Sequence, residues 1–375
     1  MSTWKKVKLS DIGEIVGGAT PPTSREEYYN GDIPWLTPKD LAGYHERYIC
    51  RGERNITKEG LDACSAKIMP QGTVLFSSRA PIGYVAIAKN GICTNQGFKS
   101  IIPNPNIDSL FLYYLLVYNK NTIEAFGSGT TFKEVSAETM RNIEVRIPDF
   151  QTQKAISAIL NSLDTKIEIN HNLKHNLQNQ MTTIFRQARS RSSWKSRKLG
   201  DILIFYDNLR KPLSSVQREK MKHIYPYYGA TSIVDYVDDY LCEGLYILIS
   251  EDGANVVDSL GQPLIQYTYG KFWVNNHAHV VKGRQNYSEA LIYAMLGSLN
   301  MQSIVTGAAQ PKINQANLRN FEVAVPEFEE AKSLSDILTP LLQQMILHDQ
   351  ENERLSKIRD ALLLRLMSGT FDVSQ

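Results

Sequence analysis

Residues 141–150 read RNIEVRIPDF, and residues 319–328 read RNFEVAVPEF. A shift of 178 positions (319 − 141) places Arg, Asn, Glu, Val, Pro and Phe of the first phrase on identical residues of the second. This period is far longer than the roughly 20–50 residues of a solenoid repeat, and it is close to half of the 375-residue chain. The repeated phrase therefore predicts an internal duplication, with two like halves in one chain.

Two further landmarks recur in the same order. Residues 4–15 (WKKVKLSDIGEI) match residues 194–205 (WKSRKLGDILIF) at a shift of 190 (194 − 4). Shortly before the repeated phrase, GTTFK at 129–133 faces GAAQPK at 307–312, which we align with one additional residue. The difference between the two shifts (190 − 178) makes the first domain 12 residues longer than the second. The common order supports the duplication.

The composition is that of an ordinary globular protein. The chain is 42% hydrophobic and 21% charged, and its net charge of +2 selects no partner by itself. The four cysteines (Cys50, Cys64, Cys93 and Cys242) lack CxxC spacing, which argues against a zinc finger and against a disulfide framework. The first residues lack the apolar core of a signal peptide, and no run approaches the roughly 20 apolar residues of a membrane span. We therefore expect a cytoplasmic protein without a membrane segment.

A long helix is predicted after each phrase, over residues 149–190 and 327–368. In the first of these, neither glycine nor proline occurs, and apolar residues recur at alternating steps of four and three, as in a coiled-coil seam. The shift of 178 carries this pattern onto the second helix. The predicted seam consists of Ile156, Leu160, Leu163, Ile167, Asn170, Leu177 and Met181 in the first helix and of Leu338, Leu341, Met345, His348, Leu355 and Leu362 in the second.

Polar residues interrupt both seams at related positions. Asn170 and Lys174 interrupt the first seam, and His348 and Asn352 interrupt the second at the same shift of 178. A polar residue at such a site costs stability but fixes the register of paired helices. We expect the two helices to pack antiparallel with their polar layers meeting near the middle; amphipathic helices that cover separate cores are the alternative. Pro340 predicts a kink or a break in the first turns of the second helix.

The segments that precede the helices, 1–148 and 191–326, are predicted to be two β-rich domains. Short apolar runs between glycine, proline and asparagine turns predict strands at 73–78, 84–88, 98–103, 245–250 and 279–283. Residues 109–118 and 288–297 predict helices. The expected fold class is α+β, with two mixed domains, each followed by one long helix, an approximate twofold symmetry, and a short tail at 369–375.

The search for catalytic chemistry gives no site. AFGSGTT at 125–131 resembles the S-adenosylmethionine loop of DNA amino-methyltransferases, but the Asp-Pro pair that precedes that loop is missing. The Asn/Asp-Pro-Pro-aromatic tetrapeptide that grips a flipped base is also missing. No phosphate loop, GxSxG elbow or HExxH helix is present. The chain is therefore not expected to be an enzyme.

Metal binding is not predicted either. His277 and His279 stand at alternating positions in NNHAH, where one face of a strand would carry both rings. A third ligand is not visible in the sequence. Hydrogen-bonding or DNA-facing roles are the preferred interpretation of both residues.

Several strings, together with the duplicated plan, carry a family resemblance. They are IPWLTPKDL (33–41), LFSSRAPIGYVAI (75–87), TNQGF (94–98), ILNSLDTKIEINHNL (159–173), YPYYGATSIVDYVDDYL (225–241), LISEDGANV (248–256) and TGAAQPKI (306–313). Over essentially its whole length, the chain resembles the specificity subunit of a type I restriction-modification system.

The resemblance implies target recognition without catalysis. In this family each variable domain reads one half of a bipartite double-stranded DNA sequence, and the paired helices bind two methyltransferase subunits. Restriction subunits complete an ATP-driven endonuclease of phage defence. S-adenosylmethionine would then lie on the methyltransferase subunit, and ATP and Mg on the restriction subunit, so that this chain binds no cofactor. Two like helices would offer like surfaces to two identical partners.

The resemblance also directs attention to turn-rich loops as base readers. Arginine and lysine suit guanine, and asparagine and glutamine suit adenine. The candidate DNA-binding residues are Lys39, Arg79, Thr130, Thr131 and Lys133 in the first domain and Tyr228, Thr231, His277, Gln310 and Lys312 in the second. A lysine among them can also contact phosphate, which positions the protein without specifying a sequence.

Two other classes of function stay open on the sequence alone. A non-DNA scaffold, with two β-rich modules on a coiled-coil ruler, is compatible with the near-neutral charge. A catalytic DNA methyltransferase is opposed by the missing motifs. An orphan or phase-variable specificity subunit, active with a partner encoded elsewhere, remains within the main interpretation.

Overall fold

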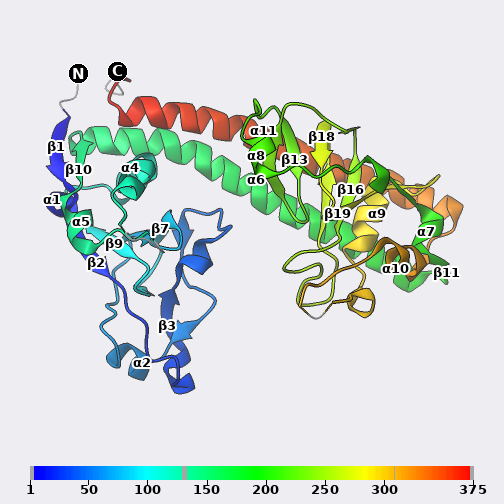
Figure 1. The fold of residues 1–375 in the computed structure, drawn as a ribbon, viewed down its shortest axis with the longest axis horizontal. Coiled ribbons are helices and arrows are strands. Elements are labelled where there is room, and N and C mark those ends of the chain that lie inside the picture. Colours follow the sequence, from blue (N-terminus) through cyan, green and yellow to red (C-terminus); the bar gives the residue numbers. More distant parts are fainter. Residues whose placement is uncertain (1–3, 129–132, 308, 372–375) are drawn as a thin grey trace. The chain divides into compact units, whose positions relative to one another are not determined.

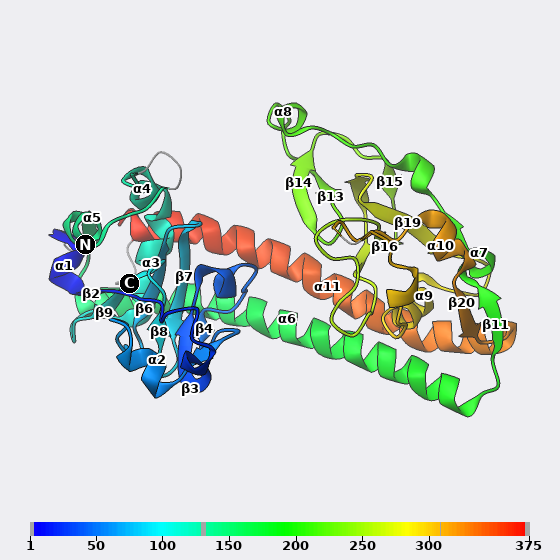
Figure 2. The same cartoon turned by 60° about the horizontal axis from the view of Figure 1, so that its bottom comes forward.

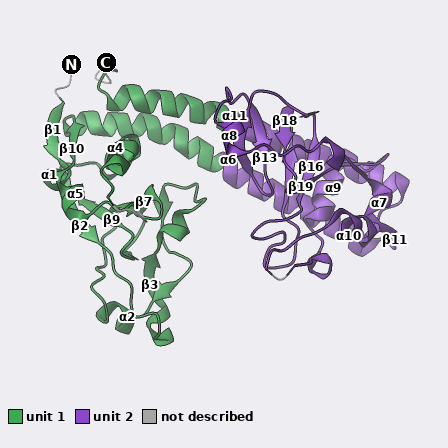
Figure 3. Ribbon diagram, in the orientation of Figure 1, with its two compact units in different colours: residues 1–169, 351–375 green, residues 170–350 purple. Residues whose placement is uncertain are grey.

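The computed structural model describes residues 4–128, 133–307 and 309–371, and the chain divides into two compact units. Unit 1 comprises residues 1–169 and 351–375, and unit 2 comprises residues 170–350 (Figure 3). Two long helices, α6 (Phe150–Arg191) and α11 (Phe328–Met367), each contribute a segment to both units (Figure 1). Each helix begins at the phenylalanine that ends the repeated phrase. Because the units divide both helices, their boundaries differ from the linear domain ranges expected from the sequence.

Unit 1 contains a five-stranded sheet in the order β2-β9-β6-β7-β4, a three-stranded sheet β5-β3-β8, and the pair β1-β10. Its strands are β1 (Lys5–Lys8), β2 (Gly13–Gly17), β3 (Tyr29–Leu36), β4 (Tyr48–Ile49), β5 (Asn55–Ile56), β6 (Val74–Ser78), β7 (Ile82–Ala88), β8 (Cys93–Thr94), β9 (Lys99–Pro103) and β10 (Glu144–Ile147). Its shorter helices are α1 (Leu9–Ile12), η1 (Glu26–Tyr28), η2 (Pro38–Leu41), α2 (Lys58–Asp62), α3 (Ser109–Tyr118), α4 (Lys120–Ala125) and α5 (Ala137–Asn142).

Unit 2 contains two four-stranded sheets, β12-β19-β16-β17 and β14-β13-β18-β15, and the pair β11-β20 (Figure 2). Its strands are β11 (Lys195–Lys198), β12 (Leu203–Phe205), β13 (Tyr225–Tyr228), β14 (Ile233–Val237), β15 (Cys242–Glu243), β16 (Tyr246–Ser250), β17 (Ile265–Thr268), β18 (Lys271–Val274), β19 (Ala278–Gly283) and β20 (Glu322–Val325). Its shorter helices are α7 (Leu199–Ile202), η3 (Asp207–Leu209), α8 (Ser215–Arg218), α9 (Glu289–Leu296), η4 (Gln302–Ile304) and α10 (Gln315–Asn320).

The two units repeat one strand topology, which confirms the predicted duplication. The antiparallel ladder β2-β9-β6-β7 of unit 1 corresponds to β12-β19-β16-β17 of unit 2. The parallel pair β3–β8 corresponds to the parallel pair β13–β18. The predicted strands and the α+β class are confirmed, since all five apolar runs lie in strands.

Helix starts repeat at the level of single side chains. Asp108 caps α3 and Ser288 caps α9, each accepting a hydrogen bond from a backbone N–H three residues on. Ser136 and Asn314 cap α5 and α10 in the same way. Such a side-chain oxygen satisfies an N–H group that has no partner within the helix. The two predicted short helices are thereby confirmed, and local capping explains where they begin.

The long helices pair antiparallel within each unit. In unit 1, Asp164 of α6 pairs with Arg359 of α11 (2.9 Å), and Asn352 donates to the carbonyl of Ile167 (3.4 Å). The residue number therefore rises on one helix as it falls on the other. In unit 2, Lys174 of α6 pairs with Asp349 of α11. These contacts confirm the predicted antiparallel packing.

The seam residues differ in burial. The seam residues that are buried are Ile156, Leu160, Ile167, Asn170, Met181, Leu338 and Met345, and those that are half-buried are Leu163, Leu177, Leu341, His348, Leu355 and Leu362. Leu160 belongs to a core of unit 1, and Met181 and Leu338 belong to one core of unit 2. α11 runs through Pro340 without interruption, so the break considered there is not found.

In each unit a polar contact, which we call the anchor, joins the β-rich part to a long helix. In unit 1, Arg47 is buried and makes a bidentate ion pair with Glu168 of α6 (Nε 2.9 Å, Nη2 2.8 Å). In unit 2, Tyr267 of β17 donates its hydroxyl to Asp349, the carboxylate that also pairs with Lys174. The same task is thus performed by a guanidinium in one unit and by a phenol in the other.

A tryptophan lies at the start of each copy. In unit 1, Trp4 lies 6.4 Å from Phe111 between ring centroids, and a Cβ added at Gly369 would come within 2.7 Å of the Trp4 Nε1 atom. In unit 2, Trp194 lies 5.2 Å from Phe185 and donates from Nε1 to Glu330 (2.8 Å). Each indole therefore packs where a long helix ends and a β1- or β11-type strand begins.

Candidate nucleic-acid interface

A loop returns to the end of the central strand in each unit. In unit 1, Glu134 forms isolated β-bridges with Ser128 and with Arg79, which directly follows β6. In unit 2, Lys312 forms the same bridges with Thr306 and with Asp252, two residues beyond β16. We call this place the bridge site: it consists of Ser78, Arg79, Lys99 and Glu134 in unit 1 and of Glu251, Asp252, His279 and Lys312 in unit 2.

Backbone hydrogen bonds establish which residues are equivalent. The amide of Val135 donates to Ser78 O (3.0 Å), and the amide of Ile313 donates to Glu251 O (2.8 Å). The amides of Ser78 and Glu251 in turn donate to the carbonyls of Gly97 (2.7 Å) and His277 (2.9 Å). Ser78 thus corresponds to Glu251.

These equivalences correct the alignment of the two loops. The bridged pairs 128/134 and 306/312 have the same spacing, so neither loop has an additional residue. Lys312 therefore corresponds to Glu134, whereas Lys133 corresponds to Pro311. The pairing of the two lysines suggested by the sequence was wrong, because short polar strings leave a one-residue ambiguity that only hydrogen bonds remove.

In the bridge site of unit 1, one carboxylate lies between two cations. Glu134 pairs with Arg79 (3.6 Å) and with Lys99 (3.3 Å). The side chain of Lys99 is 11% exposed and also donates to Ser78 Oγ (3.4 Å), whereas that of Arg79 is 34% exposed. The acid is therefore neutralised from inside the protein, and the more exposed cation lies on the strand.

In unit 2 the carboxylate belongs to the strand and the exposed cation to the loop. Glu251 pairs with Lys312 (3.0 Å), whose side chain is 45% exposed, and with Arg210, whose side chain is 16% exposed. Burial raises the pKa of Glu251, but the hydrogen bonds from Arg210 and Lys312 outweigh it, so the net pKa lies below its ordinary value. Glu251 is thus held as a carboxylate.

A histidine completes the network beneath this pair. His279 is fully buried, with Nδ1 2.7 Å from Asp207 Oδ2 and Nε2 2.8 Å from the carbonyl of Ile313. Both ring nitrogens of His279 therefore face oxygen atoms. Burial raises the pKa of Asp207, but the hydrogen bond from His279 outweighs it and leaves a net lowering.

Asp207, Glu251 and His279 also have the spacing of a metal-ligand group. Their ligand atoms lie within 4.8 Å of one another, and the group contains His279 but not His277, so it is not the pair that the sequence suggested. However, hydrogen bonds occupy both nitrogens of His279, and Arg210 and Lys312 already supply positive charge. The cluster therefore has the character of an ion-pair network.

The structure gathers several predicted residues around the bridge sites. Arg79 and Lys312 belong to them, and Lys133 is exposed next to Glu134. His277 is exposed, and its Nδ1 contacts Asp252. Gln310 is exposed two residues before Lys312.

The remaining predicted residues lie elsewhere. Lys39 is exposed on η2 and pairs with Glu53 (3.0 Å), and Thr231 is exposed between β13 and β14. Tyr228 is buried, with its ring 5.5 Å from that of Phe272, so this side chain packs in the core and presents no edge to a partner. Thr130 and Thr131 lie outside the residues that the structure describes.

Sequence reasoning missed the acids and the poorly exposed cations of both networks. Glu134, Lys99 and Glu251 were not selected, although LFSSR (75–79) and LISED (248–252) occupy corresponding places after an apolar strand. Aligning those two strings would have revealed the exchange of Ser-Arg for Glu-Asp. Arg210 and Asp207, which pair with each other, gave no such signal, because their partners Glu251 and His279 lie far away in the chain.

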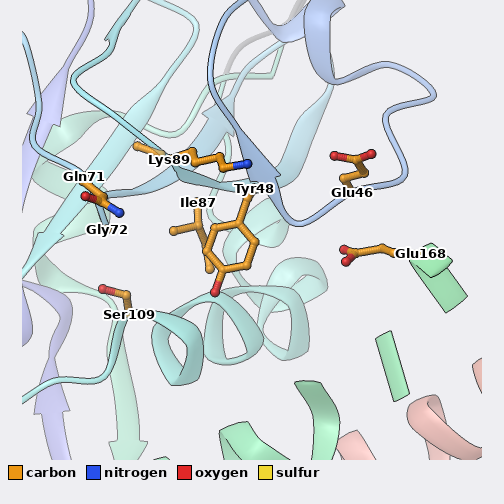
Figure 4. A pocket seen from close by; sticks show the side chains of 9 residues that line it. Glu46, Tyr48, Gln71, Gly72, Ile87, Lys89, Ser109 and Glu168 are labelled. Carbon is orange, nitrogen blue, oxygen red and sulfur yellow. The ribbon is translucent and has the colours of Figure 1, made fainter. Parts of the chain in front are cut away.

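A cavity of about 450 Å³ lies in unit 1 beside the Arg47 anchor (Figure 4). Tyr48, Lys89 and Glu46 line it, as does Glu168, whose carboxylate is engaged by Arg47. The lining mixes both signs of charge. It gives no constellation for catalysis or for a cofactor.

Comparison with known proteins agrees with this architecture. The model of the family "Type I restriction modification DNA specificity domain" matches residues 1–179 and 191–357. The MjaIX specificity subunit of Methanocaldococcus jannaschii is 31% identical, with 99% of this chain and 94% of that protein covered. The EcoprrI specificity subunit of Escherichia coli is 22% identical, with 88% of this chain and 85% of that protein covered.

A solved structure shows the same fold. The S subunit of a type I restriction-modification system from M. genitalium superimposes with a TM-score of 0.55 at 20% identity, and the match covers 98% of this chain and 96% of that one. Among the described residues, none of the helices has the length and apolar character needed to cross a membrane. The predicted family is confirmed: this chain belongs to the type I restriction-modification specificity subunits.

Proposed function

We propose that this chain reads a bipartite double-stranded DNA sequence, one half-site with each unit, and directs methyltransferase and restriction subunits to it. The chain itself contributes no catalytic step. S-adenosylmethionine would be held by the methyltransferase subunit, and ATP and Mg by the restriction subunit. Family membership supports this function, and one observation carries it: the two bridge sites have the same backbone but different charged side chains.

Different side chains on one backbone plan suit two different half-sites. If the units bound one common ligand, the same residues would be expected at Ser78/Glu251 and at Glu134/Lys312. Base edges in the major groove differ in their pattern of donors and acceptors, so a new half-site requires new side chains. The candidate readers that are accessible in the structure are Lys39, Arg79, Lys133, Thr231, His277, Gln310 and Lys312.

The long helices carry matched apolar positions for identical partners. Ile169 of α6 and Leu347 of α11 are related by the shift of 178 (347 − 169) and are 47% and 53% exposed. Neither belongs to the predicted seam. Two equivalent surfaces on one chain fit two copies of one methyltransferase subunit.

The decisive experiment is a methylome. The chain is co-expressed with its candidate methyltransferase subunit in a host without DNA modification, complex formation is verified by affinity purification, and modified bases are mapped by sequencing. A single bipartite motif with a fixed gap is the expected result. An assembled complex that leaves the DNA unmodified and binds it without sequence preference would favour the scaffold function. Modification by the chain alone would revive the catalytic methyltransferase.

A further inference from the structure

We infer that Arg79 and Lys312 each read a guanine, one in each half-site, and that Glu134 and Glu251 are the positioning residues that hold these cations. This inference rests on the proposed function and names the residues that would perform it. It follows from a pattern of charges that recurs at the two bridge sites, with Arg210 included in unit 2, although no two equivalent positions carry the same residue.

The shared pattern is a row of three charges. In each unit an acid pairs with two cations, one of them poorly exposed and the other, which we call the outer cation, more exposed. In unit 1 these are Lys99, Glu134 and Arg79. In unit 2 they are Arg210, Glu251 and Lys312.

The chain positions of the acid and the outer cation are exchanged between the units. Arg79 stands on the strand side of the bridge and Glu134 on the loop side, whereas in unit 2 Glu251 is on the strand side and Lys312 on the loop side. A simple duplication would have kept the sign of charge at each position. The acid lies between two cations in both units, although the acid and the outer cation have exchanged places in the chain. This indicates that the arrangement of charges is itself required.

The row of charges leaves the outer cation available to a ligand. In unit 1 Lys99 neutralises Glu134, so that row has one positive charge in excess, whereas in unit 2 Arg210 is shared between Glu251 and Asp207. Arg79 and Lys312 therefore keep hydrogen-bonding capacity for a further acceptor, since a guanidinium has five N–H donors and an ammonium three.

The acid beside the outer cation favours a base edge over a phosphate. A carboxylate next to the cation repels a phosphate, which carries a full negative charge, but it repels the neutral O6 and N7 acceptors of guanine far less. Holding a long side chain against an acid also reduces the rotamer entropy that is lost on binding. Arginine and lysine contacts to guanine O6 and N7 are the commonest specific contacts in the major groove.

The test uses the full complex and its methylome, with Arg79→Ala and Lys312→Ala made separately. Arg79→Ala should reduce the preference for one guanine in one half-site by about 5- to 150-fold, which is the discrimination of a good bidentate contact. The other half-site should stay unchanged, and it serves as an internal control for folding and assembly. Lys312→Ala should show the reverse. Lys6→Ala, which removes an exposed ion pair with Glu144 in unit 1, should leave both half-sites unchanged.

The positioning residues need a readout that a merely structural role would not move. Glu134→Gln should relax the same guanine as Arg79→Ala, but less, and Glu134→Asp should restore part of the preference. The double variant with Arg79→Glu and Glu134→Arg keeps an ion pair across the bridge but moves the cation to the loop side, next to Lys99. It should still assemble, and it should lose the preference for the guanine at its original position. Because this variant preserves the pair, it decides the matter even if Arg79→Ala fails to assemble.

Two negative outcomes are distinguishable. If the unchanged complex yields no bipartite motif, the proposed function fails. If it yields one and the motif survives in Arg79→Ala, in Lys312→Ala and in the charge-exchanged variant, then only the inference is overturned, and the ion pairs serve only to hold the loops.

Discussion

Unit 1 and unit 2 have the same strand topology but present different chemistry from it. Their ladders pair corresponding strands, because a ladder needs backbone N–H and C=O groups and apolar residues of suitable size, which many sequences supply. At the bridge sites, Ser78 and Arg79 stand where Glu251 and Asp252 stand in the other unit. The difference teaches that the core fixes where a side chain lies, while the choice of that side chain remains free to follow a separate target.

The anchors give the largest effect by which to test this comparison. Arg47→Ala removes a buried guanidinium and leaves the carboxylate of Glu168 without its bidentate partner. We expect unit 1 to lose about 3 kcal/mol of stability, because breaking one side of a buried pair is far costlier than breaking an exposed one. Urea denaturation, followed by tryptophan fluorescence, measures the change. Lys58→Ala, which breaks the exposed pair with Asp62, should cost less than about 0.5 kcal/mol; equal losses would contradict the anchor.

The matched helix positions test whether the two units offer equal surfaces to a partner. Ile169→Lys and Leu347→Lys should each weaken the binding of one methyltransferase subunit by roughly 2 kcal/mol and leave the other copy bound. Native mass spectrometry of the complex would then show one partner copy in place of two. The double variant should bind none, whereas normal assembly of both single variants would remove these positions from the interface.

Low pH should weaken the ion-pair network around Glu251 in unit 2. The pKa values of Glu251 and Asp207 are lowered in the folded protein, so their contribution is complete above the ordinary values of 4.5 and 3.8 and is lost as the pH falls through the lowered ones. We expect Glu251→Gln to lower stability by about 2 kcal/mol at pH 7 and to flatten the loss between pH 5 and about pH 2. Thermal unfolding across that range measures both effects; an unchanged acid profile would show that the pairs do not stabilise the fold.

The smallest expected effect concerns two tyrosine hydroxyls that donate to acids of the long helices. Tyr114 donates its hydroxyl to Asp164 in unit 1 (2.7 Å), and Tyr267 donates to Asp349 in unit 2. Replacing either tyrosine with phenylalanine removes one hydrogen bond and keeps the ring, so each change should cost about 1 kcal/mol. Similar values would show that the two units, although anchored by different residues, rely on hydrogen bonds of similar strength. If Tyr267→Phe left the stability unchanged, only the hydrogen bond of Tyr114 in unit 1 would contribute to stability.

Much of the fold was predictable because repeated and periodic patterns in the sequence indicate it. The phrase at 141–150 and 319–328, the heptad seams and the apolar runs predicted the duplication, the long helices and the strands. Each of these depends on neighbours within a few residues along the chain.

The site was less predictable because its contacts join distant residues. Arg47 and Glu168 are 121 residues apart, and Asp207 and His279 are 72 apart. Tyr228 was selected as a residue of a turn-rich loop, but it lies in β13, which pairs with β18, and its side chain is buried. Charge reversal across the bridge was invisible, since the sequence alignment had placed Lys133 opposite Lys312.

The two tryptophans give the duplication a topological consequence. Trp194 is joined to the end of α6 by a short covalent segment of the chain. Trp4 contacts Gly369, which lies just beyond α11, through packing alone. The two copies are thus joined by a peptide connection at Trp194 and by a non-covalent contact at Trp4, and each of these junctions lies within a single unit. The position of the peptide linkage, and not the packing, therefore determines the order of the two copies along the chain. A chain opened at the Trp194 junction and joined at the Trp4 junction would contain the same contacts with the two copies in the opposite order.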